Sequence, residues 1–263
     1  MIPNDHAIMM YKFGKNQWIE KILEGQLSFS CAGAFINQAK VTGNTVQGDE
    51  LEGVFARLLR DDQRVQRMRE KFGNNLEEIY DGDFVFLRRK RAKFKPIFCL
   101  FAYTAGDAIT DGEPKSLGKQ KVRLEFDPRL FTGFANESMR NVVSNSHQFT
   151  IAFFQPKPFV DRVRMAMAKN NLPYQMRAVE YIDFHTEFYI EPTEEYPELF
   201  IKSDKYAYQH EARICLTGER FSTIFDRYPL SVIKFNPQDY KIIHGNIYVE
   251  FTADFQQTLS INP

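Results

Sequence analysis

The sequence lacks an excess of charge of either sign, with 34 Lys and Arg against 34 Asp and Glu. A balanced chain has no overall field that attracts nucleic acid or an anionic membrane, so any such site would have to be local. The sequence also lacks an uncharged apolar run long enough to cross a bilayer, and its first residues have neither the basic start nor the apolar core of a signal peptide. We therefore expect a soluble, cytoplasmic protein with no membrane partner.

Cysteine is scarce, and Cys31, Cys99 and Cys215 stand far apart in apolar segments. This spacing excludes a disulfide framework or a zinc knuckle and indicates three small buried residues in a reducing compartment. The histidines lack metal-ligand spacing, so we predict no metal site. The sequence also has no glycine-rich phosphate loop and no Gly-x-Ser-x-Gly turn, which leaves nucleoside-triphosphate and serine-hydrolase chemistry without support.

Hydrophobic residues are plentiful, at 43% of the chain, and include 25 Phe and 12 Tyr. The apolar pattern predicts a strand at 7–13, a helix at 16–25 and a strand at 26–31. It predicts the longest helix at 48–73, where five residues form one apolar stripe: Leu51, Val54, Phe55, Leu58 and Leu59. The last third reads almost entirely as strands. We therefore expect an α+β protein with mixed or antiparallel sheets, helices mainly in the first two-thirds, and one domain over residues 1–263.

The segment from Lys205 to Leu216, KYAYQHEARICL, reads as a strand that places Gln209, Glu211 and Arg213 on one face. A carboxylate beside a guanidinium stays ionised. Such a carboxylate can bind a ribose hydroxyl and stabilise positive charge that develops at a sugar carbon, while Gln209 could orient an acceptor. The alternative is a cross-strand ion pair with a neighbouring hydrogen bond at a sheet edge.

The first two strands carry a second group of candidates: Tyr11, Lys12, Ser28, Phe29 and Ser30. A dinucleotide needs a cation or a ring against its phosphates and ribose, an aromatic side chain for stacking, and hydroxyl donors. These residues supply all of them within twenty positions. Each one taken alone is also compatible with an ordinary strand residue.

The sequence has one concentrated basic run, from Leu87 to Lys95, LRRKRAKFK. Within it, Arg88, Arg89, Lys90 and Arg91 could grip the phosphates of a nucleic acid. The alternative is a solvated edge strand or hairpin, in which basic side chains discourage pairing with another sheet.

Four segments together resemble a bacterial family of domains of unknown function that is grouped with AbiGi-type abortive-infection proteins. The segment Met10–Gln38 resembles its opening strand, helix and strand, followed by a Phe-Asn turn at Phe35 to Asn37. Residues 96–107 and 121–127 resemble its central strands. FIKSDKYAYQHEARICL, residues 200–216, resembles its closing motif.

The layout of that family is similar in turn to the ADP-ribosyltransferase fold, which implies an activity and a set of roles. Lys12 or Tyr11 would hold NAD from the first strand, and Ser28 or Ser30 from the second. Glu211 would be the catalytic glutamate.

The remaining roles follow from the same resemblance. Gln209 would recognise the acceptor, which could be a nucleic acid or a protein, and Arg213 would belong to the cofactor site. The protein would act as a toxin or phage-defence effector, with a cognate antitoxin or defence partner. The alternative function is a non-catalytic defence or phage-related module that contacts nucleic acid or a partner protein through residues 88–95.

Overall fold

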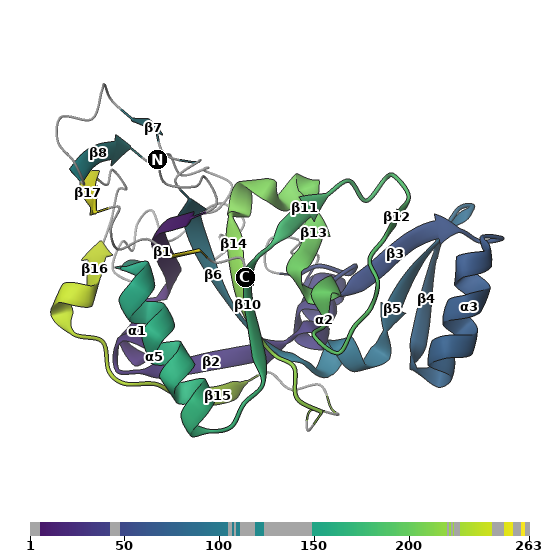
Figure 1. Cartoon of the computed structure of the whole chain (residues 1–263), viewed down its shortest axis with the longest axis horizontal. Helices are drawn as coiled ribbons and strands as arrows, with labels where there is room; N and C mark the ends of the chain where they lie inside the picture. Colours follow the sequence, from purple (N-terminus) through teal and green to yellow (C-terminus); the bar gives the residue numbers. More distant parts are fainter. Residues whose placement is uncertain are drawn as a thin grey trace.

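Figure 1 shows the computed structural model of the chain. The structure describes residues 6–42, 48–104, 107, 109–110, 119–123, 149–219, 221, 223, 227–243, 250–254 and 259–260. Over these residues the strands pair almost entirely in antiparallel fashion, and the α-helices lie in the first 169 residues. The predicted α+β class is confirmed. None of the described helices is long and apolar enough to cross a membrane.

The largest sheet in the described residues has nine strands, all in antiparallel pairs. Its main path, in spatial order, is β10 (Tyr174–Ala178), β14 (Glu211–Leu216), β6 (Pro96–Thr104), β1 (His6–Lys15), β9 (Phe149–Phe154) and β16 (Tyr240–Ile243). Off this path, β2 (Gln26–Cys31) pairs with β6 and with β15 (Tyr228–Ser231), and β18 (Leu259–Ser260) pairs with β1. The strands β1, β2 and β14 therefore each pair with β6.

The predicted strand, helix and strand at the start of the chain are confirmed. Between β1 and β2, α1 (Asn16–Leu23) buries Ile19, Ile22 and Leu23 against the main core. Gly25 ends this segment with φ +84°, and a Cβ there would lie 2.3 Å from the Val232 carbonyl oxygen, so the close approach requires glycine. After β2 the chain forms α2 (Ala32–Thr42), so Phe35 to Asn37 lie in a helix and not in the turn that the family resemblance implied.

The predicted helix at 48–73 is wrong in its first half. Val54–Leu59 forms strand β3, and the helix α3 begins only at Gln63 and ends at Phe72. Val54 through Leu58 are all buried, because β3 lies between β12 and β5 and is covered on both faces. A strand buried on both faces has a continuous apolar run, which cannot be told from a helical stripe by periodicity alone.

Three smaller sheets complete the described fold. The four-stranded sheet runs in the order β12 (Phe188–Tyr189), β3, β5 (Phe84–Arg89) and β4 (Leu76–Asp81), and α3 lies beside it at one end of the molecule (Figure 1). The parallel pair is β11 (Glu180–Ile182) with β13 (Ile201–Ser203). The third sheet holds β17 (Glu250–Asp254), β8 (Lys119–Arg123) and β7 (Ile109–Thr110).

The remaining helical segments connect or cover these sheets. The helix α5 (Pro156–Lys169) packs its apolar face, including Phe159 and Val163, into the main core. Short 3-10 segments join the strands: η1 (Gly73–Asn75), η2 (Lys90–Phe94), η4 (Pro197–Phe200), η5 (Asp204–Gln209) and η6 (Pro237–Asp239).

Candidate functional site

Glu211 opens strand β14, and its position depends on a turn at the preceding residue. His210 adopts a left-handed conformation, φ 45° and ψ 48°, where η5 ends. Gln209 therefore stands in the 3-10 segment and not on the strand, so the prediction of three alternating strand residues holds only for Glu211 and Arg213. Gln209 still reaches the same place: Lys202 Nζ donates to Gln209 Oε1 at 2.8 Å and to Glu211 Oε2 at 3.0 Å.

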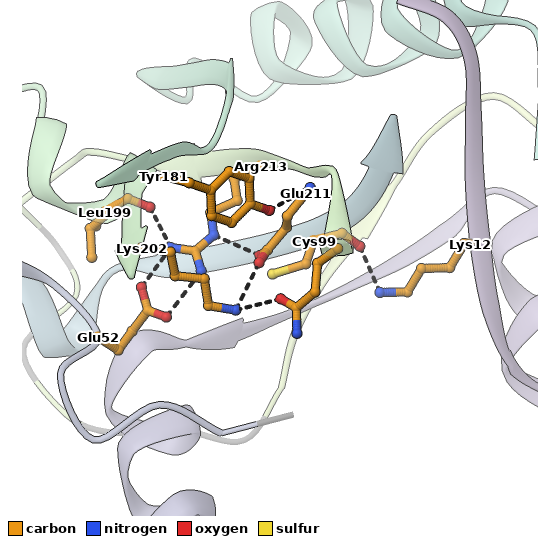
Figure 2. A network of polar contacts seen from close by, with 9 residues as sticks. Lys12, Glu52, Cys99, Tyr181, Leu199, Lys202, Glu211 and Arg213 are labelled. Carbon is orange, nitrogen blue, oxygen red and sulfur yellow. Dashed lines mark hydrogen bonds and ion pairs between the residues drawn. The ribbon is translucent and has the colours of Figure 1, made fainter. Parts of the chain in front are cut away.

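Four charged side chains form a continuous buried chain of ion pairs, which we call the cavity network: Glu52, Arg213, Glu211 and Lys202. Arg213 Nε donates to Glu211 Oε1 at 2.7 Å, and its two terminal nitrogens bind both oxygens of Glu52 at 2.5 and 3.0 Å (Figure 2). Arg213 also donates to the Leu199 carbonyl at 2.5 Å. The four side chains are 1–9% exposed. The guanidinium is thereby fixed between two carboxylates.

The cavity network keeps Glu211 ionised. Burial acts against the charged carboxylate, but the Arg213 and Lys202 charges outweigh it and hold the pKa of Glu211 well below its usual range. Lys202 responds in the opposite sense: burial lowers its pKa, yet the Glu211 charge dominates and the pKa is raised. Burial raises the pKa of Glu52, although Arg213 opposes that shift. Of the two carboxylates in the cavity network, Glu211 therefore keeps its negative charge more readily than Glu52 does.

Two further hydrogen bonds lie next to the cavity network. The backbone N–H of Glu211 donates to the Tyr181 hydroxyl at 2.9 Å, and Lys12 Nζ donates to the Cys99 carbonyl at 2.6 Å (Figure 2). Burial raises the pKa of the Cys99 thiol and lowers that of Lys12. Burial thus favours the protonated form of the Cys99 thiol, which lies in the cavity wall described below.

A cavity of about 200 Å³ opens beside the cavity network. Its wall includes six of the residues that the sequence singled out: Lys12, Ser28, Ser30, Gln209, Glu211 and Arg213. These residues come from β1, β2, η5 and β14, which are distant in sequence. The structure therefore brings the two predicted groups of polar residues to one place.

Tyr11 and Phe29 lie elsewhere. Ser28 and Ser30 alternate with Phe29 along β2, so Phe29 points into the main core, with its ring 5.5 Å from that of Phe98. The Tyr11 ring stacks on Phe101 at 4.9 Å and is 1% exposed. Because both rings are covered by neighbouring side chains, neither presents a face on which a base could stack.

The basic run divides into two parts. Arg88 and Arg89 are 1% and 3% exposed, whereas Lys90 and Arg91 are exposed. Arg88 binds Glu77 at 3.3 Å, and Arg89 Nε binds Glu198 at 2.7 Å. Arg88 and Arg89 therefore pair with carboxylates of the protein, the partly exposed Glu77 and the buried Glu198, because their strand β5 is paired on both sides, with β3 and with β4. Of the alternative prediction, the edge strand is wrong for the same reason, whereas β5 does form a hairpin with β4, and Lys90 and Arg91 at the end of the run are exposed.

Three charged residues of the cavity wall were missed by the sequence analysis: Asp49, Glu52 and Lys202. Asp49 and Glu52 fall in the segment that was predicted as a helix. Lys202 offered a signal, because it is a lone cation in the apolar segment Leu199–Ser203. A lysine with no acidic neighbour in its own apolar segment indicates a carboxylate partner elsewhere in the fold.

Comparison with protein-family models, curated proteins and solved structures finds no match. A functional assignment for this chain consequently depends on the chemistry of the cavity.

Proposed function

We propose that the chain is an ADP-ribosyltransferase-like enzyme that uses NAD, with the cavity beside Glu211 as its active centre. The observation that supports this proposal most strongly is the ionised Glu211 carboxylate, which shares one cavity wall with Lys12, Ser28 and Ser30. The ADP-ribosyltransferase-like fold, the nucleic-acid or protein acceptor and the role as a toxin or phage-defence effector belong to the same proposal.

The polar groups of the wall fit the sugar part of NAD. A cation, two hydroxyls and a carboxylate are what a ribose with an adjoining phosphate requires. Drug-sized ligands occupy pockets of roughly 300–1,000 Å³. The cavity of about 200 Å³ is smaller than these, so we assign it to the ribose next to the nicotinamide, and the rest of the dinucleotide would lie outside it.

The reaction supplied by NAD is cleavage of the bond between ribose C1′ and the nicotinamide nitrogen. The electron pair of that bond leaves with nicotinamide, and an acceptor nucleophile forms the new bond to C1′ and loses its proton. Glu211 would face the positive charge that develops at the sugar, in a largely buried site where the exclusion of water strengthens the attraction. Arg213 and Lys202 hold both carboxylate oxygens and keep them from turning away. Gln209, fixed by the same lysine, would orient the acceptor.

The test is release of nicotinamide and transfer of label from radioactive NAD to components of a cell lysate. We expect activity in the wild-type protein and a loss of about 10²- to 10³-fold in Glu211→Gln, as for other preorganised electrostatic groups. Glu195→Gln is the matched control, because Glu195 is an exposed carboxylate, with 59% of its side chain accessible.

Thermal unfolding shows whether the Glu211→Gln variant is folded. If it is not, nicotinamide release by the wild-type protein still decides the question. Absence of both release and transfer in the wild-type protein would overturn the proposal, as would equal activity in a folded Glu211→Gln variant. Expression of the wild-type gene should slow growth, and the substitution should relieve this effect.

A further inference from the structure

Asp49 differs from Glu52 and Glu211 in the cavity wall because, within the described residues, no cation forms an ion pair with it, although the charges of Lys202 and Arg88 act on it from a distance. Its residue is 6% exposed, and Oδ1 accepts a hydrogen bond from the Leu51 backbone N–H at 3.0 Å. Within the described part of the chain, Asp49 forms no ion pair and its Oδ2 accepts no hydrogen bond. Glu52 and Glu211, in contrast, are each bound by Arg213. Asp49 therefore brings an uncommitted acceptor oxygen to the cavity.

Asp49 Oδ2 lacks the donor that Oδ1 has in the Leu51 N–H, and a ligand in the cavity that donates to this oxygen gains a hydrogen bond to a charged group. The ligand groups could be cations or neutral hydroxyls. The charged residues of the wall are three cations, Lys12, Lys202 and Arg213, and three carboxylates, Asp49, Glu52 and Glu211. Because these charges balance, the cavity has no excess negative charge to attract a cation. Neutral hydroxyl donors are the better match.

We propose that Asp49 accepts hydrogen bonds from two neighbouring hydroxyls of the bound sugar, so that the cavity selects a ligand with a vicinal diol. This inference rests on the proposed function, since it assigns the diol to the ribose next to nicotinamide. Oδ2 and the remaining lone pair of Oδ1 supply the two acceptor positions. Glu211, whose oxygens are both held by cations, is left to face the sugar carbon that reacts.

The experiment measures binding to the full chain by calorimetry. The probe is an NAD analogue in which a methylene group replaces the oxygen of the nicotinamide-ribose ring, so that it is not cleaved. Two further probes carry fluorine in place of the 2′- or the 3′-hydroxyl of that ribose. We expect each fluorinated probe to bind the wild-type protein about 10- to 100-fold more weakly, the factor for a hydrogen bond to a charged group.

The protein variants are Asp49→Asn and a matched control, Glu50→Gln. Glu50 is the neighbouring residue and is exposed, so its substitution removes the same charge outside the cavity. We expect Asp49→Asn to bind the parent probe about 10- to 100-fold more weakly and to discriminate little between the three probes. Glu50→Gln should behave as the wild-type protein does.

The outcomes separate the two proposals. If the wild-type protein binds the parent probe but loses less than about threefold with either fluorinated probe, the diol assignment is overturned and the proposed function stands. The same holds if folded Asp49→Asn binds like the wild-type protein. If the wild-type protein binds none of the probes, both proposals fail. The fluorinated probes need only the wild-type protein, so the test survives an Asp49→Asn variant that does not fold.

Discussion

Two buried arginines, Arg213 and Arg89, make a useful comparison because both pair with buried carboxylates and both were singled out from the sequence. Arg213 belongs to the cavity network and lines a cavity. Arg89 binds Glu198 at 2.7 Å and the Thr193 carbonyl at 2.6 Å, and its guanidinium lies 4.2 Å from the centre of the Tyr196 ring. Arg89 is therefore held by three protein groups at 3% exposure, whereas one side of the cavity network faces a cavity.

The two carboxylates in this comparison differ in how completely they are satisfied. Glu211 has a cation at each oxygen, and its pKa is lowered. Glu198 is 0% exposed and has a cation at only one oxygen, while Oε2 has no hydrogen-bond partner. Burial consequently dominates and raises the pKa of Glu198. A buried ion pair by itself thus says little about function, and the neighbouring cavity is what distinguishes the two sites.

The largest expected effect is on stability, at the buried pair of Arg89 and Glu198. Glu198→Ala leaves the Arg89 guanidinium buried without its carboxylate, and we expect a loss of about 3–5 kcal/mol in the free energy of unfolding. Denaturant unfolding measures this loss. Glu195→Ala, which removes a largely exposed partner of Arg177, should cost less than about 1 kcal/mol. A similar small cost for Glu198→Ala would show that the Arg89 site is not the structural one.

An intermediate effect is expected in the pH dependence of stability, with opposite signs at the two sites. The lowered pKa of Glu211 gives stability that is present above the unfolded-state value, about 4.3, and is lost as the pH falls through the folded-state pKa. The raised pKa of Glu198 gives stability that is present below about 4.3 and is lost as the pH rises through the folded-state pKa.

Unfolding free energies of the wild-type protein, Glu211→Gln and Glu198→Gln, measured from about pH 7 to about pH 4, test these signs. The cost of Glu211→Gln should fall as the pH falls, and the cost of Glu198→Gln should rise. Parallel curves for the two variants would contradict the contrast between the sites.

The smallest effect is expected at the exposed end of the basic run. Lys90→Ala and Arg91→Ala should each change the free energy of unfolding by less than about 0.5 kcal/mol, because both side chains are exposed. The pair of substitutions also tests the binding-module alternative. If the chain binds nucleic acid through this run, the double variant should flatten the salt dependence of binding. Unchanged binding would remove the run from any such interface.

Local patterns predicted part of the fold well. The start of the chain could be assigned because α1 is amphipathic and β2 alternates, so each buries one face. The pattern failed at β3, whose residues are buried on both faces and carry no periodicity of two. It also failed at Gln209, where the left-handed turn at His210 replaces the expected strand. That turn depends on contacts with distant residues, including the hydrogen bond from the Ala102 N–H to the His210 carbonyl.

The sequence by itself determined part of the candidate site, since the alternation of Ser28 and Ser30 with Phe29 and of Glu211 with Arg213 is a local property, but it did not single out Asp49, Glu52 or Lys202. Only the tertiary structure decided which charges are partners. Arg213 meets Glu52 across 161 positions, and Arg89 meets Glu198 across 109. Pairing over such distances is set by how the sheets pack, and packing also decides which pair borders a cavity and which is enclosed.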